Sequence, residues 1–209
     1  MGVFSSKNIK LLLDPLVKNN PITVQVLGVC SALAVTVKLE PAIVMALALV
    51  VVTGVSNLVI SSIRNFIPHS IRMIVQLVVI SAIVIPIDQV LKAYAFEVSK
   101  QLSVFVGLII CNCIVMGRLE AYAMANKPWP SFLDGVGTGA GYGLLLVFVA
   151  FIRELLGSGT LLDYQIIPQA FYDFGYQNNS FIILPPMALI IVGVIIWVQR
   201  AHSLKKAKV

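Results

Sequence analysis

Six stretches of this chain contain no charged residue, and they constrain its fold more than any other feature. Their lengths are 19, 23, 15, 17, 18 and 26 residues. The stretches are residues 19–37, 41–63, 73–87, 101–117, 135–152 and 174–199. An α-helix needs roughly 20 mostly apolar residues to cross the hydrocarbon core of a bilayer. The sequence therefore predicts an all-α membrane protein with six transmembrane helices, forming a single integral membrane domain over residues 1–209.

The composition supports this class and excludes others. Only 11% of the residues are charged, against about 25% in a typical soluble domain. The net charge is +6, but the Lys and Arg residues stand at the ends of apolar runs and form no basic stripe with interleaved aromatics. We therefore expect a lipid bilayer, and no nucleic acid, as the surroundings of this chain.

The distribution of basic residues predicts the orientation. With six spans, one side of the membrane holds eleven Lys and Arg residues and the other side holds four. The four are Lys38, Lys92, Lys100 and Arg153. Basic residues are enriched in cytoplasmic loops. The sequence therefore predicts that both termini are cytoplasmic.

The six spans differ in strength. The third is long enough only if its helix continues through Pro86 and Asp88 to Tyr94. The first and fourth are marginal, since they are short and contain Gly, Ser, Thr or Asn. These two weak spans carry similar sequences, GVCSALAVTVKLE at 28–40 and GLIICNCIVMGRLE at 107–120.

This similarity indicates an internal repeat, with copies over approximately residues 19–98 and 99–200. Three spans in each copy would insert the second copy upside down. Paired, interrupted hydrophobic segments in the two halves of such a protein indicate a buried functional site. The predicted fold is therefore two inverted three-helix repeats with broken or half-helices at the paired segments.

The paired segments hold all three cysteines, Cys30, Cys111 and Cys113. A buried cysteine is usually a small apolar packing residue. The alternative is metal binding, because thiolate is the ligand of iron–sulfur clusters. On a continuous helix Cys111 and Cys113 would lie about 200° apart and face different sides. The spacing of the cysteines alone leaves both interpretations open.

Four stretches resemble the D subunits of the sodium-translocating NADH:quinone reductases. They are NNP followed by QVLGVCSALAVTVKLE, ISSIRNFIPHSIRMIVQ, SKQLSVFVGLIICNCIVMGRLEAYAM and FIRELLGSG. The E subunit of the Rnf electron-transfer complex is homologous to these proteins and is the alternative. The sequences GVCSALAVT and SKQLSVFVGLI are more similar to those of the sodium-pumping reductases than to those of the Rnf subunits.

The resemblance implies a membrane subunit of a six-subunit respiratory complex in the bacterial inner membrane, with no complete active site of its own. In that family, the D subunit and its sister, the E subunit, together hold an intramembrane [2Fe-2S] cluster, which carries electrons across the membrane in a redox-driven sodium pump. The cysteines that match the ligands are Cys30 and Cys113. Cys111 is a departure, since Thr is expected there. NAD, FMN, FAD and riboflavin would bind other subunits, and the whole complex would reduce ubiquinone.

The depths of these two cysteines favour broken helices. On continuous helices, Cys30 would lie roughly 18 Å from Lys18, whereas Cys113 would lie roughly 7.5 Å from Arg118. Two ligands of one cluster cannot differ that much in depth. Without the resemblance, the sequence also allows a stand-alone inverted-repeat ion transporter or a structural scaffold with packing cysteines.

Three further features of the sequence invite a functional interpretation. In the glycine-rich run at 135–143, Gly135, Gly139 and Gly143 recur every four residues on one helix face, as in closely packed membrane helices, and we expect packing rather than a phosphate loop. Asp88 could lie on a sodium route or at the interface. Arg153 and Glu154 are expected to anchor a helix end at the membrane interface.

Overall fold

The computed structural model describes residues 25–94, 107–157, 160–161, 164–165 and 184–207. Their regular structure is helical apart from a two-residue antiparallel ladder between β1 (Thr160–Leu161) and β2 (Tyr164–Gln165). The long helices are α3 (Leu39–Ile63), α4 (Arg72–Tyr94), α7 (Pro128–Gly157) and α9 (Pro185–Ala207). The short ones are α2 (Val29–Val35), η1 (Arg64–Phe66), η2 (His69–Ile71), α6 (Cys113–Arg118) and the π-helix η3 (Leu119–Ala123).

Three helices of the described residues are long and apolar enough to cross a membrane: Leu39–Phe66, Arg72–Val90 and Pro128–Leu155. They correspond to the second, third and fifth predicted spans, so the prediction of an all-α membrane protein is confirmed. α4 continues through Pro86 and Asp88 to Tyr94, as its sequence requires for a full span. A shorter apolar helix covers Pro185–Ala201 in the sixth span. Residues 19–24, 101–106 and 174–183 of the predicted spans lie outside the described residues, and the six-span inverted repeat stays a prediction.

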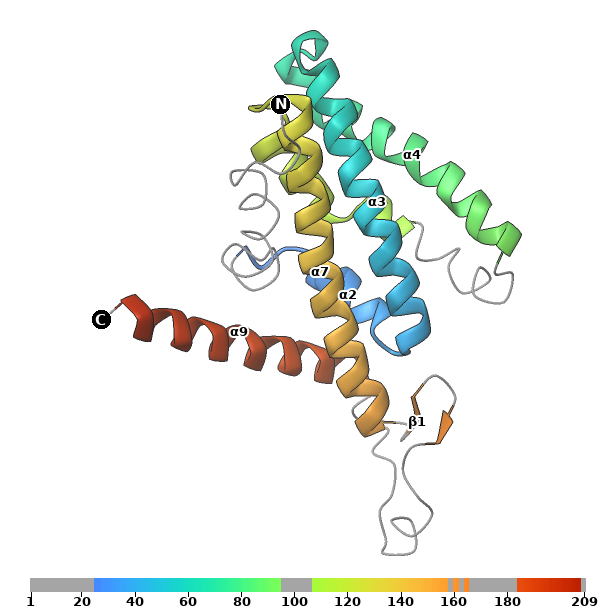
Figure 1. Ribbon diagram of the computed structural model, residues 1–209, viewed down its shortest axis with the longest axis vertical. Coiled ribbons are helices and arrows are strands. Elements are labelled where there is room, and N and C mark those ends of the chain that lie inside the picture. The colour runs from blue at the N-terminus through green and yellow to red at the C-terminus, as the bar shows by residue number, and fades with distance from the viewer. Residues whose placement is uncertain (1–24, 95–106, 158–159, 162–163, 166–183, 208–209) are drawn as a thin grey trace, which may run out of the picture.

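α3 and α7 run antiparallel, side by side, through the centre of the molecule (Figure 1). Their contact depends on three glycines of α7. A Cβ atom on Gly135 would lie 2.6 Å from the Thr53 carbonyl oxygen, and one on Gly139 would lie 2.8 Å from Val50 Cα. A Cβ atom on Gly143 would lie 2.9 Å from Ala46 Cβ. No real Cβ is found this close to other atoms, so the prediction that these glycines allow close helix packing is confirmed.

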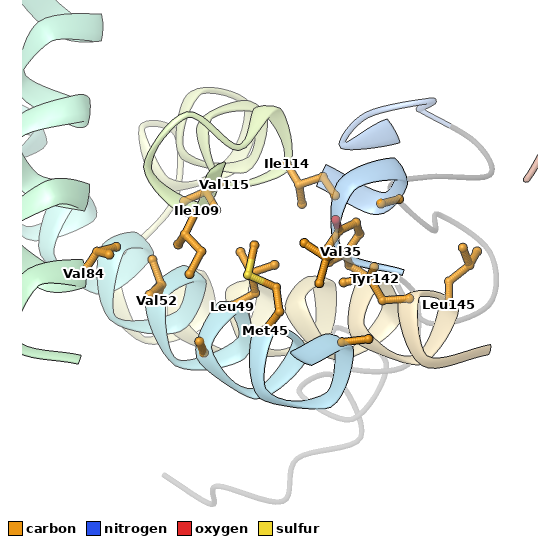
Figure 2. Packing of buried hydrophobic residues seen from close by; sticks show 14 of the residues in the cluster. Val35, Met45, Leu49, Val52, Val84, Ile109, Ile114, Val115, Tyr142 and Leu145 are labelled. Carbon is orange, nitrogen blue, oxygen red and sulfur yellow. The ribbon is translucent and has the colours of Figure 1, made fainter. Parts of the chain in front are cut away.

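The hydrophobic core forms where the short cysteine-bearing segments cover the α3–α7 pair (Figure 2). Met45, Leu49 and Val52 of α3 contribute one side of this core. The core also contains Val35, Ile109, Ile114, Val115, Tyr142 and Leu145. α4 and α9 diverge from the central pair (Figure 1) and leave many large apolar side chains exposed. Lipid or partner subunits would cover such faces in a membrane.

Charged side chains tie the short helices to the long ones. Arg118 of α6 donates from Nε to Asp134 of α7 over 3.0 Å, and its Nη2 atom also pairs with this carboxylate. Glu120 of η3 accepts hydrogen bonds from Arg72 and, over 3.1 Å, from Gln76, both on α4. These contacts position α6 and η3 against α7 and α4.

Candidate functional site

The backbone changes direction immediately before Cys30. Gly28 has a φ of 75° and Val26 a φ of 54°, and α2 begins at Val29. A left-handed conformation is ordinary for glycine but strained for a β-branched residue such as valine. The chain therefore enters α2 through an irregular segment, and Cys30 lies in the first turn of this short helix.

A second interruption lies next to Cys113. Residues 107–110 are helical, the helix breaks at Cys111 and Asn112, and α6 starts at Cys113. Asn112 caps α6, since its Oδ1 accepts a hydrogen bond from Ile114 N over 3.1 Å. Treating Cys111 and Cys113 as residues of one continuous helix is therefore wrong, because the capping asparagine between them ends one helix and begins the next.

The structure brings these two segments into direct contact. Asn112 Nδ2 donates to Ser31 Oγ over 3.2 Å, so the neighbour of Cys113 bonds the neighbour of Cys30. A Cβ atom on Gly28 would lie 2.9 Å from Ile114 Cγ1, which shows how closely the backbone at 28 approaches α6. The two similar segments thus lie against each other through residues beside Cys30 and Cys113.

Tyr142 of α7 completes a buried polar network beneath the two segments. Its hydroxyl group lies 2.6 Å from Ser31 Oγ and donates a longer hydrogen bond, of 3.5 Å, to the Gly28 carbonyl. Ser31 Oγ also donates to the Gly28 carbonyl over 2.9 Å. Ser31, Asn112 and Tyr142 are all buried, so these bonds form in an apolar environment where they favour one arrangement of the segments.

Sequence reasoning did not identify Ser31, Asn112 and Tyr142 as site residues. Ser31 and Asn112 could have been found as the polar neighbours of the cysteines. Tyr142 has only a weak signal, a polar aromatic residue within the glycine-rich face of a membrane helix.

The cysteines themselves lie on the surface of the chain. Cys30, Cys111 and Cys113 are free and exposed, although their neighbours Ser31 and Asn112 are buried. Among the residues that the structure describes, no group of three or more His, Cys, Asp or Glu side chains could hold a metal ion. Thiols presented in this way are available to a group that a second chain also binds.

Arg153 and Glu154 are not interface anchors, and that expectation is wrong. Their exposed fractions are 0% and 6%. Arg153 Nη1 donates to Thr36 Oγ1 over 2.6 Å and to the Leu33 carbonyl over 3.4 Å, at the end of α2. Glu154 Oε2 accepts a hydrogen bond from Leu39 N over 2.5 Å, at the start of α3. A cation thus lies at a helix C-terminus and an anion at a helix N-terminus, which are the favourable positions.

Replacing Arg153 by Met should destabilise the protein and loosen the end of α2. The Thr36 hydroxyl group donates its proton to the Ala32 carbonyl. Its oxygen in turn accepts a hydrogen bond from Arg153, which Met cannot donate. A buried acceptor left without a donor costs about 1–3 kcal/mol. We expect a lower thermal unfolding midpoint for the Arg153→Met protein in detergent. Arg153→Lys keeps the charge and a hydrogen-bond donor, so its unfolding midpoint should fall less than that of Arg153→Met. Equal midpoints for wild type and Arg153→Met would contradict a capping role.

The sequence is similar to those of known membrane proteins. Residues 8–196 match the family described as Rnf-Nqr subunit, membrane protein. The D subunit of the Na⁺-translocating NADH-quinone reductase from Shewanella putrefaciens (strain CN-32 / ATCC BAA-453) is 57% identical over 194 residues, which are 93% of this chain and 92% of the relative. The D subunits from Shewanella sp. (strain W3-18-1) and Shewanella baltica (strain OS155 / ATCC BAA-1091) have the same identity and coverage. The chain belongs to the Rnf-Nqr family of membrane subunits.

Proposed function

We propose that this chain is the D subunit of a sodium-translocating NADH:quinone reductase in the bacterial inner membrane. The identity to relatives that carry this name extends over 93% of the chain. It favours the quinone reductase over the Rnf complex and over a stand-alone transporter. The protein would have both termini in the cytoplasm and six spans in two inverted repeats. Its partners would be the other subunits of the complex, chiefly its sister, the E subunit.

Within that complex, Cys30 and Cys113 would hold a [2Fe-2S] cluster together with two cysteines of the E subunit. The observation that carries this proposal is the 3.2 Å hydrogen bond between Asn112 and Ser31, which joins the two cysteine segments at the residues beside the thiols. Exposure of both cysteines supports ligation shared with a second chain. Thiolate is the usual ligand of such clusters. The donor set of this chain therefore fits the cluster, with two ligands left for the partner.

The residues of this chain would position the cluster. When bound, the cluster supplies one-electron transfer across the membrane. Ser31, Asn112 and Tyr142 hold the two thiolates in register through their buried hydrogen bonds. The interrupted backbone at Val26–Gly28 and at Cys111–Asn112 needs protein around it, since lipid cannot satisfy free backbone groups. The E subunit would supply this cover, and the two breaks would be the ends of half-helices.

Iron analysis of the chain with and without the E subunit tests this proposal. Expressed alone, the chain should contain no stoichiometric iron, because two or three thiolates do not complete a four-ligand cluster site. Expressed with the E subunit and purified as a pair, it should contain two irons per pair and show the visible absorption of an iron–sulfur cluster. Stoichiometric iron in the chain purified by itself would contradict a shared cluster.

A further inference from the structure

Two basic side chains at one end of the α3–α7 pair have no carboxylate partner among the residues that the structure describes. Arg64 directly follows α3, and Lys127 directly precedes α7. The ion pairs of the described residues involve other Lys and Arg side chains. Because α3 and α7 are antiparallel, the end of one lies beside the start of the other (Figure 1). Two positive charges without a counter-charge therefore lie at the same end of the pair.

A hydrogen bond places the Arg64 guanidinium group next to Lys127. Arg64 Nη1 donates to the Asn126 carbonyl oxygen over 2.7 Å, and this carbonyl group belongs to the peptide bond that joins Asn126 to Lys127. Ser61 Oγ donates to the same oxygen over 2.6 Å, which fixes this peptide against the end of α3. A guanidinium group has five N–H donors, so Arg64 keeps donors for a further ligand, and the side chain of Lys127 is exposed beside it.

The acidic residues of this end are already paired. Its Lys, Arg, Asp and Glu residues are Arg64, Arg72, Arg118, Glu120, Lys127 and Asp134. Glu120 pairs with Arg72, and Asp134 pairs with Arg118. The charges of Arg64 and Lys127 are therefore left over, and a surface with such an excess of positive charge attracts an anion.

Arg64 and Lys127 lie at the membrane boundary. The membrane-crossing stretch that contains α3 ends at Phe66, and the one in α7 begins at Pro128. Phospholipid headgroups occupy the zone next to the ends of transmembrane helices. Phe66 and Trp129 are exposed at this end, with exposed fractions of 87% and 51%. Because Trp is enriched at the level of the headgroups, the anion within reach of the two cations is the phosphate group of a lipid.

Exposed apolar side chains at the same end favour a lipid over a free anion. They lie at the end of α3, in η2 and in the first turn of α4: Ile63, Ile71, Met73 and Ile74. α4 contacts α3, so these side chains belong to the helices that meet at this end. An inorganic anion cannot cover such a surface, whereas a phospholipid has a phosphate group and apolar chains in one molecule.

We propose that Arg64 and Lys127 bind the phosphate group of an anionic phospholipid at the end of the α3–α7 pair. The planar guanidinium group of Arg64 matches two phosphate oxygens, and the ammonium group of Lys127 adds a point charge. The acyl chains of the lipid lie along the exposed apolar side chains of α3 and α4. This site contains neither Cys30 nor Cys113, so it does not depend on the proposed cluster.

Lipid-dependent stability of the assembled complex in detergent tests this site. Thermal unfolding midpoints are measured at rising phosphatidylglycerol, with phosphatidylcholine and inorganic phosphate as comparators. A ligand that binds only the folded state raises the midpoint with its concentration. In Lys127→Gln, the phosphatidylglycerol concentration for half of the maximal rise should increase about fivefold, as expected for one basic residue at an anionic lipid. In Arg64→Gln/Lys127→Gln, it should increase about twenty-five-fold if the two contributions add.

Matched controls separate this site from the general effect of positive charge. Lys38 is exposed and precedes α3 at its opposite end, so Lys38→Gln removes the same charge far from the proposed site. It should keep the wild-type response to phosphatidylglycerol. Lys127→Arg and Arg64→Lys keep both charges and should also keep the response. Because the Lys127 side chain is exposed, Lys127→Gln tests the site even if Arg64→Gln disturbs the contact with Asn126.

Native mass spectrometry gives a second measurement. Complexes released from nanodiscs of phosphatidylglycerol and phosphatidylcholine in equal parts should retain phosphatidylglycerol in the wild type and lose it in Arg64→Gln/Lys127→Gln.

Several results would overturn the lipid site. One is an equal response of the wild type and the double variant to phosphatidylglycerol. An equal rise of the wild-type midpoint with phosphatidylcholine would show that the charges are not read, and an equal rise with inorganic phosphate would show a site for a free anion. Loss of another subunit from the double variant, with an unchanged response to phosphatidylglycerol, would show that the two cations bind a protein partner instead of a lipid.

Discussion

Cys30→Ser and Cys113→Ser should each abolish the iron–sulfur signal and NADH-driven quinone reduction by the assembled complex. A serine hydroxyl is a poor replacement for a thiolate on iron, whereas a packing cysteine tolerates Ser. Cys113 starts α6 directly after Asn112, which bonds the neighbour of Cys30. Cys111 lies on the other side of Asn112. Cys111→Thr should therefore leave the iron–sulfur signal and the quinone reduction nearly unchanged.

The measurements are iron content, the electron paramagnetic resonance signal of the reduced cluster, NADH-driven quinone reduction, and NADH oxidation by an artificial acceptor. NADH oxidation by an artificial acceptor at the cytoplasmic NADH-oxidising subunit should survive in all three variants, because those electrons never reach the membrane. If Cys111→Thr removes the iron and Cys113→Ser does not, the assignment of the ligand is wrong. If all three variants keep the signal and both activities, the cysteines are packing residues and the redox function of this chain fails.

The membrane helices could be predicted from the sequence because hydrophobicity and charge are local properties. The uncharged stretches 41–63 and 135–152 lie within α3 and α7, and the glycine spacing on α7 indicates the close contact that forms there. The third span is also correct, because α4 continues beyond the uncharged stretch 73–87, which by itself is shorter than the roughly 20 residues that a span needs.

The polar contacts of the site could not be predicted, because they join residues far apart in the chain. Tyr142 meets Ser31 across 111 positions, and neither residue signals its partner. The interface role expected for Arg153 and Glu154 was wrong for the same reason. A charged pair near the end of an apolar run is typical of the membrane interface. Here the pair is buried because the α2–α3 connection lies against it, so that Arg153 bonds the end of α2 and Glu154 bonds the start of α3.

The irregular backbone at the cysteines could be predicted only in part. The difference in depth between Cys30 and Cys113 predicts that one or both helices are broken. In the described residues a helix breaks at Cys111 and Asn112, just before Cys113. A break in the first span stays a prediction, because residues 19–24 lie outside the described residues. The residues that make the interruptions were not evident. Gly28 has a conformation that glycine favours, and Asn112 is a capping residue, but both types also occur in ordinary membrane helices.

Gly28→Ala should remove most of the cluster from the assembled complex although no ligand is changed. An alanine at Gly28 would have a φ of 75°, in the left-handed region that side chains disfavour, at a cost of about 1–2 kcal/mol. Its Cβ would also collide with Ile114, which follows Cys113, and would lie 3.2 Å from Tyr142 Cε2. Separation of the two segments would break the Asn112–Ser31 bond and move the two thiolates apart.

Gly107→Ala is the matched control, because a Cβ atom at Gly107 meets no atom of the described residues within 4 Å and Gly107 belongs to the helical stretch 107–110, just before Cys111. It should keep the iron content and the quinone reductase activity of the wild type. The double variant Gly28→Ala/Ile114→Ala removes the side chain that the new methyl group strikes, so it should recover part of the iron if collision dominates over backbone strain. Wild-type iron content in Gly28→Ala would contradict the close approach of the two segments on which the shared site depends.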